Sequence, residues 1–96
     1  MQRFRIHHRH EPSECGAVVA SWRGFSSPLR HEVAVSSCPF GGHEIWWDVD
    51  GVSEAEVLAR LPPFVARRST AIPVGRLTTS RVTRPIPDLP EEESNP

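Results

Sequence analysis

The sequence holds four side chains with the chemistry of metal ligands: His10, Cys15, Cys38 and His43. Two thiols and two imidazoles suit Zn²⁺, Ni²⁺ and other borderline divalent metals. The spacing matches no zinc finger, because the chain has neither a Cys-x-x-Cys pair nor a His-x₃-His pair. Cys15 could instead pack as a small hydrophobe, and the two cysteines could form a disulfide. The four residues are therefore candidate ligands only if the fold brings them together.

A second candidate site surrounds His7, in a segment whose residues alternate between polar and apolar. Residues 3–9 place arginines and His7 on one face of a half-buried strand, and residues 44–50 place acids and Trp46 on one face of another. Antiparallel pairing of these strands predicts three opposed pairs: Arg9 with Glu44, His7 with Trp46, and Arg5 with Asp48. His7 is then the candidate general acid or base, and the other five residues are candidate ligand-binding groups.

Changes in the hydrophobic period predict the elements that position these residues. Strands are expected over 3–9, 31–38 and 44–50, with a last strand around 72–74 that Pro73 places at a sheet edge. The 31–38 strand is expected to point Val33 and Val35 inward. A helix is expected after Pro12, with an apolar stripe at Cys15, Val18, Val19, Trp22 and Phe25. A second helix begins at a Ser53–Glu56 capping box and presents Ala55, Leu58 and Leu61 until Pro62 and Pro63 interrupt it.

The predicted order of strand, helix, strand, strand, helix, strand is that of the ferredoxin-like α+β fold, with a four-stranded antiparallel sheet and both helices on one face. Residues 1–79 are expected to form this single domain, and residues 80–96 a disordered, proline-rich acidic tail. The topology places the end of the 3–9 strand, the start of the first helix and the turn before residue 44 at one end of the sheet. It therefore predicts that the four candidate metal ligands gather there.

The layout resembles a known superfamily over about residues 3–78. With its short turn at residues 39–42 and its Leu-Pro-Pro-Phe break at residues 61–64, it is similar to small dimeric α/β-barrel proteins of the ferredoxin-like type. That superfamily includes muconolactone isomerase-like enzymes, cofactor-free monooxygenases, polyketide cyclases and many uncharacterised domains. The resemblance implies a homodimer whose open sheet faces enclose a pocket. Residues 10–15 (His-Glu-Pro-Ser-Glu-Cys) and 41–43 (Gly-Gly-His) also look like a pattern in uncharacterised ferredoxin-like proteins with no assigned activity.

Composition narrows the classes of function and partner. The chain has no Lys and no Tyr, which excludes Schiff-base lysine chemistry, a Walker lysine and a tyrosine acid. Residues 1–84 carry eleven arginines against eight acids, a net +3 without a basic stripe, so no nucleic-acid partner is expected. No apolar run is long enough to span a bilayer, and the first ten residues lack a signal-peptide core. We therefore expect a cytoplasmic protein with no membrane partner.

Two functions follow as hypotheses. A tryptophan at the centre of an open sheet face exposes a large apolar area, which a second copy of the chain would cover. The first hypothesis is therefore a homodimer that binds a small organic ligand in a partly wet pocket, either as a carrier or as a cofactor-free isomerase, cyclase or monooxygenase. The alternative is a module that binds Zn²⁺ or another divalent metal, or a non-catalytic interaction subunit that uses the acidic tail.

Overall fold

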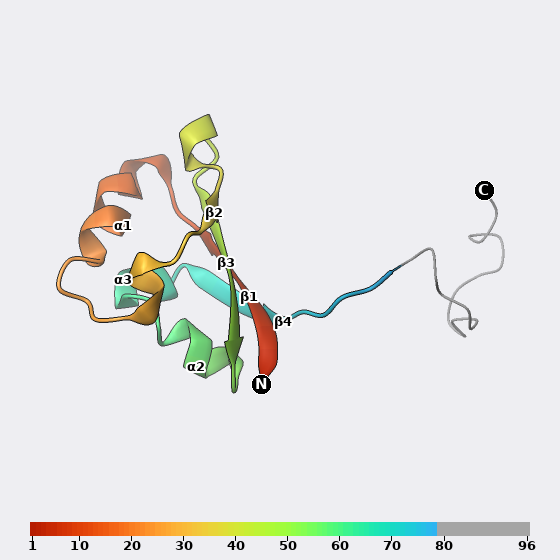
Figure 1. The fold of residues 1–96 in the computed structure, drawn as a ribbon. Helices are drawn as coiled ribbons and strands as arrows, with labels where there is room; N and C mark the ends of the chain where they lie inside the picture. Colours follow the sequence, from red (N-terminus) through yellow and green to blue (C-terminus); the bar gives the residue numbers. More distant parts are fainter. Residues whose placement is uncertain (79–96) are drawn as a thin grey trace, which may run out of the picture.

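A four-stranded antiparallel sheet organises the chain, and its helices lie on one face of that sheet (Figure 1). This computed structural model describes residues 1–78, so the predicted acidic tail lies outside the described residues. The strands are β1 (Gln2–Arg9), β2 (Val35–Ser36), β3 (Glu44–Gly51) and β4 (Ser69–Pro73), and they lie side by side in the order β2-β3-β1-β4. The predicted α+β class is confirmed. So is the edge position of the last strand, where Pro73 costs no ladder hydrogen bond.

The two central strands pair in the register that their alternation predicts. Arg9 lies opposite Glu44, His7 opposite Trp46, and Arg5 opposite Asp48. Even-numbered residues of β1 from Phe4 to His8 are buried under the helices, whereas the odd-numbered ones face the uncovered side. Because a strand alternates its side chains between two faces, β1 presents one histidine to each side of the sheet.

Three short α-helices and three 3₁₀ helices connect the strands. They are η1 (Pro12–Glu14), α1 (Cys15–Ser21), η2 (Pro28–His31), η3 (Cys38–Phe40), α2 (Glu54–Leu58) and α3 (Pro63–Ala66). Ser53 caps α2 by accepting the backbone N–H of Glu56, and Pro62 separates α2 from α3 as predicted. Within residues 1–78, no helix is long and apolar enough to cross a membrane.

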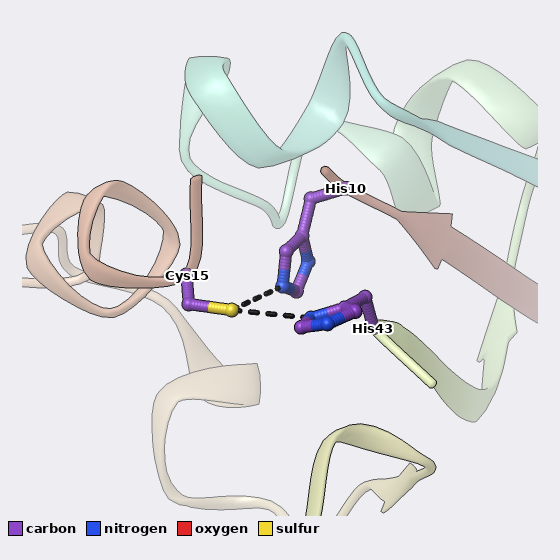
Figure 2. Close-up of side chains that lie close together, drawn as sticks. All are labelled: His10, Cys15 and His43. Atoms are coloured by element: carbon purple, nitrogen blue, oxygen red, sulfur yellow. Dashed lines mark hydrogen bonds between the residues drawn. The ribbon is translucent and has the colours of Figure 1, made fainter. Parts of the chain in front are cut away.

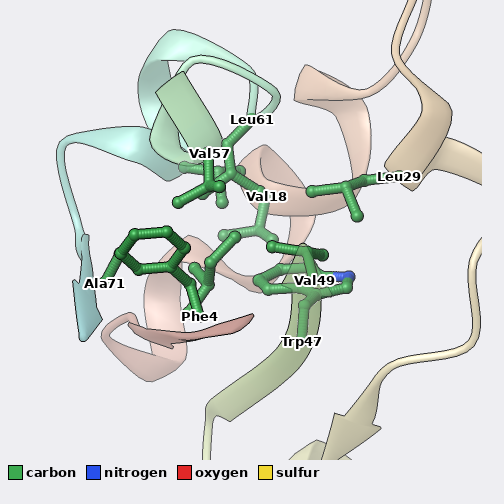
Figure 3. Close-up of a cluster of buried hydrophobic side chains, with 10 residues drawn as sticks. Phe4, Val18, Leu29, Trp47, Val49, Val57, Leu61 and Ala71 are labelled. Carbon is green, nitrogen blue, oxygen red and sulfur yellow. The ribbon is translucent and has the colours of Figure 1, made fainter. Parts of the chain in front are cut away.

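The hydrophobic core fills the space between the sheet and the helical layer (Figure 3). Its buried side chains come from every α-helix, from η2, from the link between α2 and α3 and from three of the strands: Phe4, Ile6, Val18, Leu29, Trp47, Val49, Val57, Leu61, Val65 and Ala71. Trp47 and Trp22 pack with ring centroids 6.1 Å apart, which joins the sheet to the end of α1. Burial of this apolar surface is what holds the short helices against the sheet.

The prediction for residues 31–38 is wrong in both extent and direction. Only Val35 and Ser36 form a strand, and Val33 and Val35 are 95% and 69% exposed. The register explains the exposure of Val35. This residue lies opposite Trp46 and therefore shares the uncovered face of the sheet. Leu29 of η2 occupies the core position instead, held by the cap that Ser27 provides to its N–H.

Helices α1 and α2 each bury fewer apolar side chains than the spacing in the sequence predicts. In α1 the buried residue is Val18, whereas Val19 is 69% exposed, and the helix ends at Ser21. Val57 is the buried side chain of α2, whereas Ala55 is exposed. Helices of five to seven residues complete at most two turns, so each buries one position rather than a sustained face. In β4 the inward residue is Ala71, and Ile72 faces outward beside Arg5.

Candidate metal centre

His10, Cys15 and His43 converge at the end of the sheet where β1 ends and β3 begins (Figure 2). Cys15 Sγ lies 3.4 Å from His10 Nε2 and 3.2 Å from His43 Nδ1. One ligand atom from each residue lies within 4.8 Å of the other two. A tetrahedral zinc, with Zn–S of about 2.3 Å and Zn–N of about 2.0 Å, would hold sulfur and nitrogen about 3.5 Å apart. Both sulfur–nitrogen separations are close to that value.

Backbone contacts tie together the segments that carry these ligands. The backbone N–H of His10, one residue after β1, donates to the carbonyl of His43 at 3.2 Å. Cys15 is the first residue of α1, and the preceding η1 is closed by a reciprocal capping box between Glu11 and Glu14. The Glu14 carboxylate also accepts two hydrogen bonds from Arg68, at 2.7 and 3.0 Å. This pair fastens the Cys15 segment to the α3–β4 junction.

His43 adopts a left-handed backbone conformation, with φ of 60°. For a residue with a Cβ such a conformation costs about 1–3 kcal/mol, and it persists where the surroundings enforce it. Here the preceding turn is closed by hydrogen bonds from Ser37 N–H to the Glu44 carbonyl and from Gly42 N–H to the Ser37 carbonyl, both of 2.9 Å. Gly42 has no room for a side chain, because a Cβ there would collide with Ser37. The strained backbone directs the His43 imidazole toward Cys15.

His8 extends the cluster into the core. Its side chain has no exposed surface, and its Nε2 lies 2.9 Å from Nδ1 of His10. On its other side, Nδ1 of His8 lies 3.1 Å from Ser69 Oγ and 3.3 Å from the Val65 carbonyl oxygen. Burial is the largest cause that lowers the pKa of His8, and burial followed by the charge of His43 lowers the pKa of His10. Both imidazoles are therefore neutral near pH 7, as a metal ligand must be.

Cys38, the fourth predicted ligand, does not join the group that His10, Cys15 and His43 form. It begins η3, where its backbone N–H donates to Ser36 Oγ at 3.0 Å. Both cysteines are free thiols, so the structure holds no Cys15–Cys38 disulfide. The structure therefore brings together three of the four predicted ligands.

The residues of the second predicted site lie together on the uncovered face of the sheet. His7 stacks on Trp46 with ring centroids 5.3 Å apart, and its Nε2 lies 2.7 Å from Oε1 of Glu44. Arg5 donates two hydrogen bonds to Asp48, at 2.8 and 3.0 Å. Arg9 lies opposite Glu44 in the predicted register, but the Glu44 carboxylate contacts His7, and the Arg9 side chain is exposed. An open recess beside them is lined by Arg5, Val33, Val35, Trp46 and Asp48.

Sequence reasoning missed the contact between His8 and His10 and the ion pair between Glu14 and Arg68. The first contact could have been inferred, because the alternation of residues 3–9 places His8 on the same face as Phe4 and Ile6, and His10 follows in the same phase. The second joins residues 54 positions apart, and no local pattern indicates it.

The ion pair predicts a pH dependence of stability. The hydrogen bonds from Arg68 are the largest cause that lowers the pKa of Glu14 below its ordinary value of 4.5. A carboxyl with a lowered folded-state pKa stabilises the fold above its unfolded pKa, and this contribution is lost as the pH falls through the folded pKa. We expect Glu14→Gln to lower the melting temperature near pH 7, with the difference from the unmodified protein shrinking as the pH falls below the ordinary carboxyl pKa of 4.5 and through the lowered folded-state pKa. Glu54→Gln, which changes an exposed acid, is the control, and a deficit for Glu14→Gln that stays the same over this pH range would contradict the prediction.

Comparisons of this chain with protein-family models, with curated proteins and with solved structures found no match.

Proposed function

We propose that this chain binds a zinc-class divalent metal ion through His10, Cys15 and His43. The observation that carries the proposal is the convergence of one thiol sulfur with one ring nitrogen from each of two histidines, drawn from three segments of the chain. A thiolate with two neutral imidazoles is a ligand set that zinc uses, and it favours zinc over Mg²⁺ or Ca²⁺, which prefer oxygen. Free thiols also suit a reducing compartment, so we propose a cytoplasmic location.

Three protein ligands leave one position of a tetrahedral ion for water or another molecule, which is the arrangement of reactive rather than purely structural zinc. His10 is buried, but Cys15 and His43 are each partly exposed, so solvent can reach the site. One thiolate against a doubly charged cation leaves a net positive charge. The fourth position therefore favours an anionic ligand such as hydroxide or a carboxylate.

Elemental analysis of the full chain, purified without an affinity tag, tests the proposal. We expect about one zinc-class ion per chain, since such sites retain their metal during purification. A Cys38→Ser variant should retain the same content, because Cys38 lies outside the group. Less than about 0.1 ion per chain in the unmodified protein, persisting after incubation with Zn²⁺ and removal of the excess, would exclude the site.

The uncovered sheet face supports a second proposal, that two ferredoxin-like chains dimerise there and enclose a small organic ligand without a cofactor. Trp46 is only partly buried, with His7 stacked on it and the exposed Val35 opposite it in β2. On this face β1 carries a basic row and β3 an acidic row: Arg3, Arg5 and Arg9 against Glu44, Asp48 and Asp50. A two-fold axis running along the boundary between the strands would set each basic row over the partner's acidic row.

The chemistry of such a pocket would centre on His7. Its imidazole is the candidate general acid or base, and Oε1 of Glu44, 2.7 Å from its Nε2, holds the ring in place. The Trp46 indole supplies an aromatic wall, and Arg5 and Arg9 are cations that can bind an oxyanion or carboxylate. Isomerisation, cyclisation or oxygenation of a small aromatic acid is the class of reaction that this set favours.

Analytical ultracentrifugation tests the dimer. The unmodified chain is expected to sediment as a dimer at micromolar concentration, and Trp46→Ser as a monomer with unchanged circular dichroism, because Trp46 is not part of the buried core. Val52→Ser removes a 75% exposed apolar side chain elsewhere and is the matched control. A monomeric unmodified chain would eliminate this proposal and leave the metal site unaffected.

A further inference from the structure

A series of hydrogen bonds connects the α3–β4 junction with Cys15. The contacts at the junction determine which ring nitrogen of His8 carries the proton. The Val65 carbonyl can only accept hydrogen bonds, and Ser69 Oγ donates to it at 2.7 Å. The hydroxyl proton of Ser69 is therefore engaged, and its oxygen can only accept from His8. Nδ1 of His8 lies within 3.3 Å of both oxygens. It must carry a proton, because a bare nitrogen there would face two acceptors.

The same reasoning determines the protonation of His8 Nε2 and of the two ring nitrogens of His10. A neutral imidazole has one N–H, and His8 is fully buried with its proton on Nδ1, so its Nε2 carries a lone pair. That lone pair lies 2.9 Å from Nδ1 of His10, which must then be the donor. The remaining nitrogen of His10, Nε2, is consequently unprotonated. It is also the nitrogen that lies 3.4 Å from Cys15 Sγ.

We propose that His8 is the positioning residue of the metal site, because it holds His10 in the tautomer whose Nε2 lone pair faces Cys15. This inference rests on the proposed metal function and names the group that prepares one of its ligands. Metal-binding histidines usually donate their second ring N–H to a carboxylate, a carbonyl or water. In this protein the acceptor is the imidazole of His8. The other nitrogen of that ring contacts the Val65 carbonyl, so the metal site is connected to the α3–β4 junction.

The tautomers can be measured directly, without metal and without substitutions that affect folding. Long-range ¹H–¹⁵N correlation spectra of the full chain in EDTA near pH 7 distinguish the Nδ1–H from the Nε2–H form of each histidine. We expect the Nδ1–H form for both His8 and His10. An Nε2–H form of His10, or a doubly protonated His8, would overturn the inference. The ring signals are assigned to individual histidines through the backbone and Cβ resonances of the unmodified chain.

Metal affinity provides the second test. We expect His8→Leu to weaken the binding of Co²⁺ and Zn²⁺ by about 10–100-fold, the usual effect of losing such an outer partner. His8→Gln should lose much less, because its amide oxygen can still accept from His10. His31→Leu, which changes an exposed histidine, is the matched control and should bind as the unmodified chain does. Unchanged affinity in a folded His8→Leu variant would contradict the positioning role.

The two tests separate this inference from the function on which it rests. If the unmodified chain binds no metal, the proposed function fails, and with it the positioning role, whereas the spectra still report whether His8 sets the tautomer of His10. If metal binds but His10 shows the Nε2–H form in the metal-free chain, the metal site stands and the role of His8 is wrong. If His8→Leu does not fold, the spectra of the unmodified chain remain decisive.

Discussion

Replacing Cys15 with alanine is expected to abolish Co²⁺ binding at the His10–Cys15–His43 site. The substitution removes the only ligand of the three that becomes an anion, and it leaves two neutral imidazoles to hold a doubly charged ion. The loss of affinity should exceed the roughly 10–100-fold that follows from losing an outer partner. Titration of the metal-free chain with Co²⁺ measures this, because a bound thiolate adds a sulfur-to-cobalt charge-transfer band in the near ultraviolet.

Cys38→Ala is the matched control for that titration. It removes the other free thiol, which lies in η3 and outside the cluster, so the band should remain at full intensity. Both substitutions delete the same atoms from partly exposed positions, so a difference between the two variants reports on the site rather than on general damage to the fold. A band that survives Cys15→Ala, or that disappears with Cys38→Ala, would show that the metal is bound elsewhere.

Metal binding is also expected to stabilise the fold strongly. The three ligands come from the end of β1, the start of α1 and the residue before β3, so they converge only in the folded chain. A ligand that binds only the folded state adds about 2.7 kcal/mol of stability when its free concentration is 100 times its Kd. For a domain of this size each kcal/mol shifts the melting temperature by about 4–8 °C. Saturation with Zn²⁺ should therefore raise the melting temperature by more than about 10 °C over the EDTA-treated protein.

The Cys15→Ala variant provides the reference for this shift. Its melting temperature should be the same in Zn²⁺ and in EDTA, whereas the variant without Cys38 should show the full increase. An equal rise in the Cys15→Ala protein would mean that Zn²⁺ acts through other groups. No rise in the unmodified chain at saturating Zn²⁺ would contradict coupling between the site and the fold.

The central part of the fold was predictable because two strands carry a complete alternation. In β1 and β3, inward-facing residues such as Phe4, Ile6 and Val49 alternate with outward-facing polar ones, and opposite charges face each other in a single register. Shifting that register by one residue would bury the arginines, so the pairing is strongly specified. Residues 31–38 show a similar alternation over fewer positions. The Ser27 cap and the burial of Leu29 in η2 determine the path of that segment, and neither depends on period two.

The sequence predicted three members of the candidate metal centre, but it predicted neither the exclusion of Cys38 nor the geometry of the site. Topology alone places His10, Cys15 and His43 at one end of the sheet, which is why three of the four expected ligands meet. The exclusion of Cys38 depends on the local turn that forms η3. The left-handed conformation of His43 depends on the hydrogen bonds that close the 37–44 turn. Such details arise from contacts within the folded turn, which a hydrophobic pattern does not encode.

Both candidate sites use β1, on opposite faces. His7 points to the uncovered side, where its contacts are with Trp46 and Glu44, whereas His8 points beneath the helices and toward His10. Neighbouring residues of one strand thus supply a partly exposed imidazole on the uncovered face and a fully buried one beneath the helices. This separation allows the metal site and the open-face site to be tested by independent substitutions.

X-ray absorption spectroscopy of the zinc-loaded full chain tests the central claim most directly, because it reports which atoms surround the metal. We predict a first shell of one sulfur at about 2.3 Å with two imidazole nitrogens, and a light fourth ligand, at about 2.0 Å. Cys15→Ala should retain no zinc at this site once the excess is removed, whereas the sulfur contribution should persist in Cys38→Ala. A first shell of nitrogen and oxygen alone in the unmodified chain would contradict the account.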